Sequence, residues 1–298
     1  MKKHPMLTVL IILGIFILCL SMLMAIFNRF YGVSASSVFL SKVGVISVEG
    51  AIVDSRDMVE QLVEFRKDKR IRCIILRIDS PGGGVGASQE IYREILKTRE
   101  TKHVIASMGG VAASGGYYIA AASDRIVANP GTITGSIGVI MEFVQFQELA
   151  RKIGISLEVL KSGEYKDIGS PHREMTEQER VLLTDLILDI QGQFVKAVAE
   201  GRNLPEEKVR EIADGRVFSG LMARDLGLID QIGNFQDAVE LAKEMSGIEG
   251  DVDLVYPETG KFGLLDFLLQ STSKIITKTV ADICQPGFEY RWSVPSHP

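Results

Sequence analysis

Histidine and cysteine are both scarce in this chain of 298 residues, which holds four histidines and three cysteines. The internal histidines, His103 and His172, stand in no HxH or HxxxH spacing, and no CxxC motif occurs. Zinc sites usually show such spacings, so the sequence predicts no metal site, and we expect no cofactor. A Ser-His-Asp triad would need one of these histidines, and His103 is better explained as a solvated loop residue beside Lys102.

An excess of basic residues is also missing. The chain has 33 Lys and Arg against 38 Asp and Glu, a net charge of -5. Nucleic-acid-binding proteins neutralise phosphates with clustered basic residues, so we expect no nucleic-acid partner. Only nine prolines occur and 46% of residues are hydrophobic, which is typical of a globular rather than a disordered chain.

One long run, residues 6–27, lacks charge altogether. A helix of that length rises about 33 Å, which matches a hydrocarbon core of about 30 Å. Residues 33–35 form only a poor cleavage site, so an uncleaved signal anchor is favoured. Lys2 and Lys3 precede the run and Arg29 follows it, which predicts a cytoplasmic N-terminus and a body outside the membrane.

The rest of the chain is predicted to fold as an α/β domain. Nearly continuous apolar runs, each followed by a helical segment, begin at Val43, Cys73 and Val104. Such runs, alternating with helical segments, indicate a sheet covered by helices. A further strand is expected at residues 157–160, and a capping box at Thr176 predicts the start of a long helix.

A glycine-rich turn, DSPGGG, begins at Asp79 between a predicted strand and helix, where backbone N–H groups are free to face an anion. Three interpretations remain open. The spacing of Gly82, Gly84 and Ala87 fits a dinucleotide-binding fingerprint loosely, but Glu100 ends a charged helix where that fingerprint needs an acid ending a strand. The turn could serve backbone geometry alone, or its N–H groups could form an oxyanion hole.

Ser114 lies among small residues in the segment GGVAASGGYY, which leads into an apolar helix. Serine is a preferred N-cap, which is a purely structural explanation. The surrounding glycines and alanines leave room for a substrate backbone, and a helix N-terminus favours negative charge at the N–H of Gly115. Together these features favour a nucleophile.

A serine nucleophile needs a base. Because no histidine is credible, the candidate is a lysine whose pKa is lowered by burial. Lys166 lies in KSGEYKDIGSP, beside an aromatic residue and glycines rather than in a regular solvated helix. We therefore expect a buried Lys166, although this lysine taken alone would not stand out from the others.

These motifs together resemble the signal peptide peptidase A family of Ser-Lys proteases, which shares the Clp-protease/crotonase fold. The likeness covers residues 43–256 and is carried by DSPGGG from Asp79, AASGGYY from Ala112, GTITGSIGV from Gly131 and SGEYKDIGSP from Ser162. The resemblance implies that Ser114 is the nucleophile and Lys166 the general base. It also implies an oxyanion hole formed by the N–H groups of Gly83 and Gly115.

The residue patterns set the expected organisation of the chain, and its single span and length look like the short form of the family, with one protease domain. We expect a cytoplasmic N-terminus (1–5), a transmembrane signal anchor (6–27), a linker (28–42), a serine protease domain with C-terminal helices (43–256) and an amphipathic tail (257–298). Within the tail, an apolar face could lie on the membrane, at a subunit interface or in the substrate groove.

The resemblance also implies a function. It predicts a serine endopeptidase that degrades cleaved signal peptides and other apolar peptides on the periplasmic, or extracytoplasmic, side of a bacterial inner membrane. Its subunits would form a homo-oligomer with active sites at subunit boundaries. Two alternatives stay open: a membrane-anchored scaffold of the same fold without catalysis, and a crotonase-like acyl-CoA enzyme that uses the oxyanion hole alone.

Overall fold

The computed structural model describes residues 14–23, 41–257 and 289–291. It divides the chain into two units, Met1–Leu40 and Ser41–Pro298. In the first unit, residues 14–23 are helical, and no helix among the described residues of the chain is long and apolar enough to cross a membrane. Most of the predicted anchor (6–27), the linker (28–42) and the tail (257–298) lie outside the described residues, so these assignments stay predictions.

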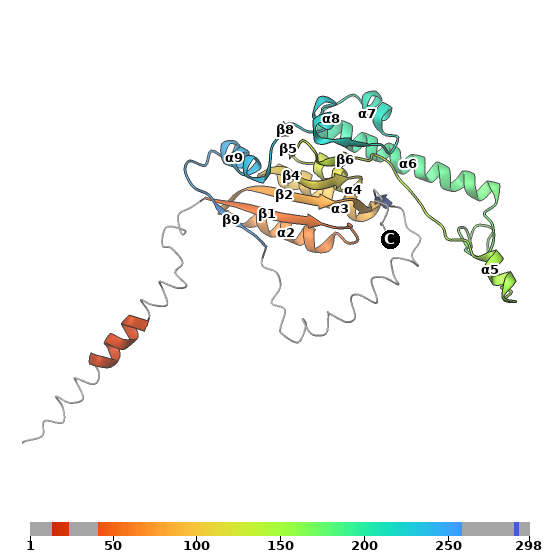
Figure 1. Ribbon diagram of the computed structural model, residues 1–298, viewed down its shortest axis with the longest axis horizontal. Coiled ribbons are helices and arrows are strands. Elements are labelled where there is room, and N and C mark those ends of the chain that lie inside the picture. Colours follow the sequence, from red (N-terminus) through yellow and green to blue (C-terminus); the bar gives the residue numbers. More distant parts are fainter. Residues whose placement is uncertain (1–13, 24–40, 258–288, 292–298) are drawn as a thin grey trace, which may run out of the picture. The chain divides into compact units, whose positions relative to one another are not determined.

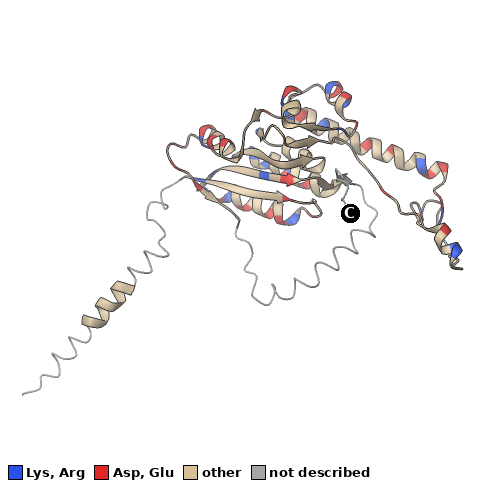
Figure 2. Ribbon diagram, in the orientation of Figure 1, with Lys and Arg blue, Asp and Glu red and all other residues tan. Residues whose placement is uncertain are grey.

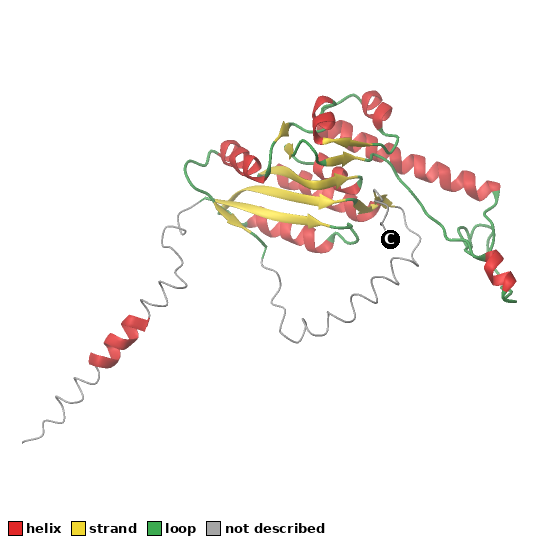
Figure 3. Cartoon of the chain, in the orientation of Figure 1, coloured by secondary structure: helices red, strands yellow, loops and turns green. Residues whose placement is uncertain are grey.

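The second unit contains a sheet of eight strands among its described residues (Figures 1 and 3). Six of them lie in the order β7-β6-β4-β2-β1-β9, while β5 pairs with β4 and β8 pairs with β5. Their bounds are β1 Lys42–Glu49, β2 Ile71–Ser80, β4 His103–Ala113, β5 Arg125–Ala128, β6 Ile133–Gly135, β7 Val217–Ser219, β8 Gln231–Ile232 and β9 Asp253–Val255. All described pairings in this sheet are parallel except that of β6 with β7.

Helices cover both faces of the sheet because successive strand residues point to opposite sides. On β2, Ile74 and Leu76 belong to one apolar core, whereas Cys73 and Ile75 belong to a second one. The first core includes side chains of α2 (Arg56–Lys67), α3 (Val85–Arg99), α4 (Gly115–Ala121) and α6 (Glu177–Arg202). The second is closed by α9 (Phe235–Ser246). The predicted sheet covered by helices is confirmed.

Charge is distributed as this layering requires. In Figure 2 the strands of the sheet are mostly uncharged, while Lys, Arg, Asp and Glu gather on the helices and loops. The shorter helices α5 (Gln147–Lys152), α7 (Glu206–Ile212) and α8 (Gly220–Asp225) complete the second unit. The capping box at Thr176 and Glu179, predicted from sequence, begins α6.

The strand predicted at residues 157–160 is wrong. These residues take no regular structure, and the side chains of Leu157 and Leu160 are 56% and 92% exposed. They lie in a segment, residues 140–176, that projects from the sheet and carries α5 (Figure 1). We call this segment the arm. Its apolar alternation resembles a strand, but a strand also needs a hydrogen-bonded neighbour, and the described residues supply none there.

The parallel topology brings two turns to one edge of the sheet. β2 and β4 are neighbours, and Ser80 near the end of one pairs with Ala112 near the end of the other. The turn after β2 forms the short strand β3 (Gly82–Gly84), and β4 leads through Ser114 into α4. Ligands of open α/β sheets bind at such carboxyl edges, so this is where a site is expected.

Candidate active site

Ser114 stands between β4 and α4 in a conformation that residues other than glycine rarely adopt. Its φ is 53° and its ψ is -117°, and the residue is 1% exposed. Its N–H donates to the carbonyl of Gly135 at 2.8 Å, and its carbonyl accepts from the N–H of Tyr118 at 2.8 Å. Strain of this kind costs about 1–3 kcal/mol and persists only where the surroundings enforce it.

The structural explanation of Ser114 as a helix cap fails. The residue occupies the N-cap position of α4, but its side chain accepts no capping hydrogen bond. A capping serine would normally have extended backbone dihedrals and would bind the N–H two or three residues later. Its hydroxyl therefore makes no capping hydrogen bond to α4.

The glycines of the two turns are required because the turns approach each other closely. A Cβ added at Gly115 would lie 3.1 Å from the backbone nitrogen of Gly83 and 2.7 Å from Oγ of Ser88. One added at Gly83 would collide with the carbonyl of Ile52. The structure thus brings Gly115, the residue after Ser114, close to the backbone nitrogen of Gly83, with the hydroxyl of Ser88 beside them.

Asp79 holds the segment that leads to Ser114, a role that the sequence analysis missed. Its carboxylate accepts hydrogen bonds from the N–H groups of Gly110 at 3.3 Å and Val111 at 3.1 Å. On the other side, the hydroxyl of Thr134 donates to the carbonyl of Ala112 at 2.7 Å. An acidic residue at the carboxyl end of a central strand was the only sequence signal for this contact.

Lys166 lies on the arm and is exposed, contrary to the burial expected from the sequence. Its backbone N–H donates to the carbonyl of Gly163 at 3.2 Å, within a turn. The structure shows no hydrogen bond or ion pair of its amine with any described residue. Ser114, by contrast, is almost fully buried, so the described part of a single chain does not assemble the two residues into a dyad.

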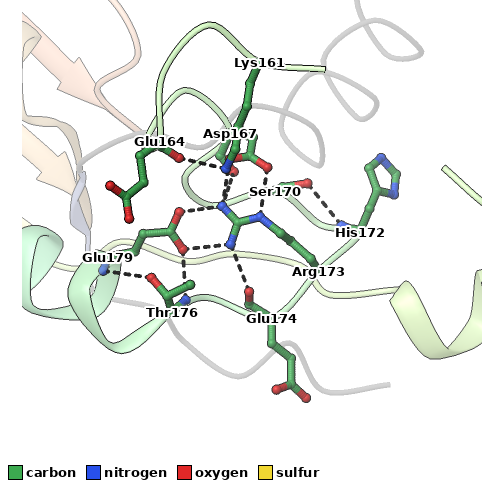
Figure 4. Close-up of polar contacts among 9 residues, drawn as sticks. All are labelled: Lys161, Glu164, Asp167, Ser170, His172, Arg173, Glu174, Thr176 and Glu179. Atoms are coloured by element: carbon green, nitrogen blue, oxygen red, sulfur yellow. Dashed lines mark hydrogen bonds and ion pairs between the residues drawn. The ribbon is translucent and has the colours of Figure 1, made fainter. Parts of the chain in front are cut away.

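Figure 4 shows a network of charged groups in the arm that includes Asp167, the residue after Lys166 in the chain. The guanidinium of Arg173 donates two hydrogen bonds of 2.8 Å to the carboxylate of Asp167 and binds Glu179 at the start of α6. Lys161 adds a bond of 2.6 Å to Asp167. The carboxylate of Glu179 also accepts from the N–H of Thr176 at 2.9 Å.

These contacts perturb the acidic groups strongly. Hydrogen bonds from Arg173 and then Lys161 hold the pKa of Asp167 well below its usual range. The pKa of Glu179 is lowered to about 2, mainly by Arg173 and next by the N–H of Thr176. Since Asp167 directly follows Lys166 in the chain, the network ties the backbone of that turn to α6. The spacing of these residues follows neither helix nor strand periodicity, and the sequence analysis missed the contacts.

The two internal histidines lie elsewhere. His103 begins β4 whereas Ser114 follows its end, and a strand of 11 residues spans roughly 30 Å. The ring of His103 faces Asp124 and is half exposed, as expected for a solvated position. The ring of His172 packs edge-on against Phe146, with 4.8 Å between centroids. The histidine triad is therefore excluded for His103 within the chain.

Comparison with known proteins decides the family. The model of peptidase family S49 matches residues 97–249, which include both Ser114 and Lys166, and the Clp protease model matches residues 33–132. The chain belongs to peptidase family S49. The resemblance to signal peptide peptidase A proteases inferred from the motifs is thereby confirmed.

Three similar relatives support this S49 membership. A Synechocystis protein provisionally named protease slr0021 is 46% identical over 211 residues, 70% of this chain and 76% of the relative. The Arabidopsis thaliana serine protease SPPA, chloroplastic, is 38% identical over 206 residues, 69% of this chain and 30% of the relative. An Enterococcus faecium protein provisionally named signal peptide peptidase SppA is 36% identical over 217 residues, 68% of this chain and 63% of the relative.

Family membership and fold agree. The S49 chain is a serine-type peptidase, and its parallel sheet with helices on both faces matches the Clp-protease-like fold that the motifs implied. The serine with the strained backbone lies inside both matched regions.

Proposed function

We propose that this S49 peptidase hydrolyses peptide bonds with Ser114 as the nucleophile and Lys166 as the general base. The observation that carries the proposal is the buried, strained Ser114, whose hydroxyl caps no helix and whose neighbour in the chain, Gly115, closely approaches the amide nitrogen of Gly83. A nucleophile placed next to backbone N–H donors is the arrangement that acyl transfer requires.

We further propose that the base comes from a neighbouring subunit. Ser114 is buried within its own chain while Lys166 is exposed on the projecting arm, which supports a site that two copies of the chain form together. The arm carries apolar side chains that are at least half exposed: Val144, Leu149, Ile153, Ile155, Leu157, Val159 and Leu160. Exposed apolar surface of this kind marks protein interfaces, and a homo-oligomer would cover it.

Each half of the proposed cycle uses one proton transfer in each direction. The neutral amine of Lys166 takes the proton of the Ser114 hydroxyl as its oxygen attacks a peptide carbonyl, and the amides of Gly83 and Gly115 stabilise the oxyanion. The protonated amine then gives that proton to the leaving amino group as the C–N bond breaks. In the second half, Lys166 takes a proton from the water that attacks the ester and returns it to the oxygen of Ser114 as the acyl group leaves as a carboxylic acid. Burial at a subunit interface would favour the neutral amine, so turnover should rise toward alkaline pH.

We propose remnant signal peptides and other apolar, membrane-proximal peptides as substrates. The name of the Enterococcus faecium relative supports this class, as does the site framed by glycine and alanine. An anchor at residues 6–27 would place the catalytic domain on the outer face of a bacterial inner membrane. A catalytically inactive scaffold of the same fold is the competing function.

The test is complementation between inactive subunits of the full-length chain, assayed with a fluorogenic peptide. Ser114→Ala and Lys166→Ala should each lower kcat at least about a thousandfold, whereas Lys152→Ala, on the same arm, should not. Co-assembly of the two inactive variants in equal amounts should restore about one active site in four if each site uses two neighbouring subunits of a ring.

Each alternative gives a different result. If the wild type turns over but the mixture of variants stays inactive, each dyad forms within one subunit. If Ser114→Ala retains wild-type turnover, the assignment of the nucleophile is wrong. A wild type without turnover on any peptide supports the scaffold.

A further inference from the structure

Helix α6 connects the core around α4 with the arm that carries Lys166. Its second half is buried, and the ring of Phe194 packs edge-on against Tyr118 of α4, with 4.9 Å between centroids. Its first half extends away from the sheet (Figure 1). Four apolar side chains there are 42% to 57% exposed: Val181, Leu182, Leu186 and Leu188. The core therefore holds α6 by its second half only, and the arm joins the projecting end.

Arg173 attaches the turn of Lys166 to the first turn of α6. Its guanidinium lies between the carboxylates of Asp167, next to Lys166, and Glu179, and it donates to both (Figure 4). The side chains of Asp167 and Glu179 are only 15% and 3% exposed. A guanidinium can bridge two carboxylates in a fixed geometry because its N–H groups lie in one rigid plane.

The amine of Lys166 depends on this attachment for its position. Lys166 is exposed, and its amine has no hydrogen-bond partner among the described residues, so its backbone turn alone determines where the amine can lie. Glu179 and Phe194 are about 22 Å apart along the helix axis, at about 1.5 Å per residue. The projecting half of α6 therefore carries the arm well away from the place where α6 packs against α4.

We propose that Arg173 is a positioning residue for the general base, an inference that rests on the proposed function. It locks the turn of Lys166 to the start of α6, so that the projecting helix presents the amine in a fixed place to the serine of a neighbouring subunit. Misplacement of a catalytic group by about 1 Å can lower the rate about a hundredfold. The start of α6 should survive loss of the guanidinium, because Glu179 still accepts from the N–H of Thr176 at 2.9 Å.

Arg173→Gln in the full-length chain tests this role with a fluorogenic peptide. The variant should lower kcat about a hundredfold and leave KM unchanged, because the base acts in the chemical step rather than in peptide binding. Arg180→Gln is the matched control. It removes the same charge from the start of the same helix, where Arg180 is 64% exposed and lies 3.9 Å from Glu177, and it should keep the wild-type kcat.

The same assay separates this inference from the proposed function. A wild-type kcat in Arg173→Gln, beside an inactive Lys166→Ala, would overturn the positioning role and leave the assignment of the base intact. Wild-type turnover by Lys166→Ala would overturn both.

Mixed oligomers distinguish positioning from a general structural effect. In the mixture of inactive variants, the Ser114→Ala chain supplies Lys166 and the Lys166→Ala chain supplies Ser114. Arg173→Gln should lower the restored turnover about a hundredfold when it is added to the first chain, and should leave it unchanged when it is added to the second. Equal losses from both chains would mean that Arg173 supports folding or assembly, and would refute the positioning role.

Hydrogen exchange tests the attachment without turnover, and it decides the matter if the mixture is inactive. Within the turn, the N–H of Ser170 donates to the carbonyl of Asp167 at 3.0 Å. Arg173→Gln should speed exchange in residues 163–170 at least about tenfold and leave the buried half of α6 unchanged, whereas Arg180→Gln should change neither. Unchanged exchange in residues 163–170 would show that Arg173 does not hold the turn, even if the enzyme proves inactive.

Discussion

Replacement of Gly115 by alanine tests the geometry of the oxyanion hole directly. The added Cβ would lie 2.7 Å from Oγ of Ser88 and 3.1 Å from the nitrogen of Gly83. The hydroxyl of Ser88 is fully buried and donates to the carbonyl of Gly84 at 3.0 Å, so it has little room to move. The methyl group would therefore push the two amides apart, or stand between them and the substrate carbonyl.

We expect Gly115→Ala to have a large effect on kcat and a small effect on the free energy of folding. Loss of one oxyanion donor typically lowers kcat by about 10²–10³, or about 2.7–4 kcal/mol. Overpacking of a tight core costs about 1–3 kcal/mol in folding free energy, and part of this is offset because alanine favours a helix over glycine by about 1 kcal/mol. Gly115→Ala should therefore stay folded and lose nearly all of its turnover.

The assay compares kcat and thermal stability of Gly115→Ala with those of Gly86→Ala. Gly86 lies in the first turn of α3, and a Cβ there would meet no heavy atom within 4 Å. That control should keep wild-type kcat and gain about 0.4–1 kcal/mol of stability. Should Gly115→Ala keep a kcat within a few fold of the wild type, the amides of Gly83 and Gly115 do not stabilise the transition state.

Two further predictions concern stability. The hydroxyl of Tyr117 donates to the carbonyl of Leu228 at 2.8 Å in a fully buried site, so Tyr117→Phe should lower the free energy of unfolding by about 1–3 kcal/mol, measured by urea titration. The pKa of Glu179 falls from 4.5 to about 2 beside Arg173, so its contribution is complete above pH 4.5 and is lost as pH falls toward 2. Urea midpoints should therefore drop less between pH 5 and 3 in Arg173→Gln than in the wild type, and equal drops would contradict the assignment.

The sheet could be predicted because its signal is local. A strand covered on both faces is apolar at every position, and the runs at Val43, Cys73 and Val104 fall in β1, β2 and β4. The capping box at Thr176 is equally local, since its two hydrogen bonds join residues three apart. In both cases the residues that determine the structure are neighbours in sequence.

The arm could not be predicted, because no local sequence pattern marks the contacts that determine its structure. Residues 157–160 alternate as a strand does, yet a strand forms only where another edge offers hydrogen bonds. Arg173 meets Asp167 through an irregular turn that has no period. The pairing of β10 (Glu289–Arg291) with β3 joins segments some two hundred residues apart, and a glycine run gives no pattern that would reveal it.

The backbone at Ser114 bears on whether the fold serves catalysis or only binding. Glycine would adopt a φ of 53° with little strain, whereas serine there costs about 1–3 kcal/mol. The hydroxyl makes no capping hydrogen bond that would offset this strain energy. Hydrogen bonds of Asp79 and Thr134 hold the preceding segment in place without the hydroxyl. A scaffold that needed only the turn would be more stable with glycine at this position. This uncompensated backbone strain is explained if the hydroxyl takes part in the reaction, which favours the peptidase over the scaffold.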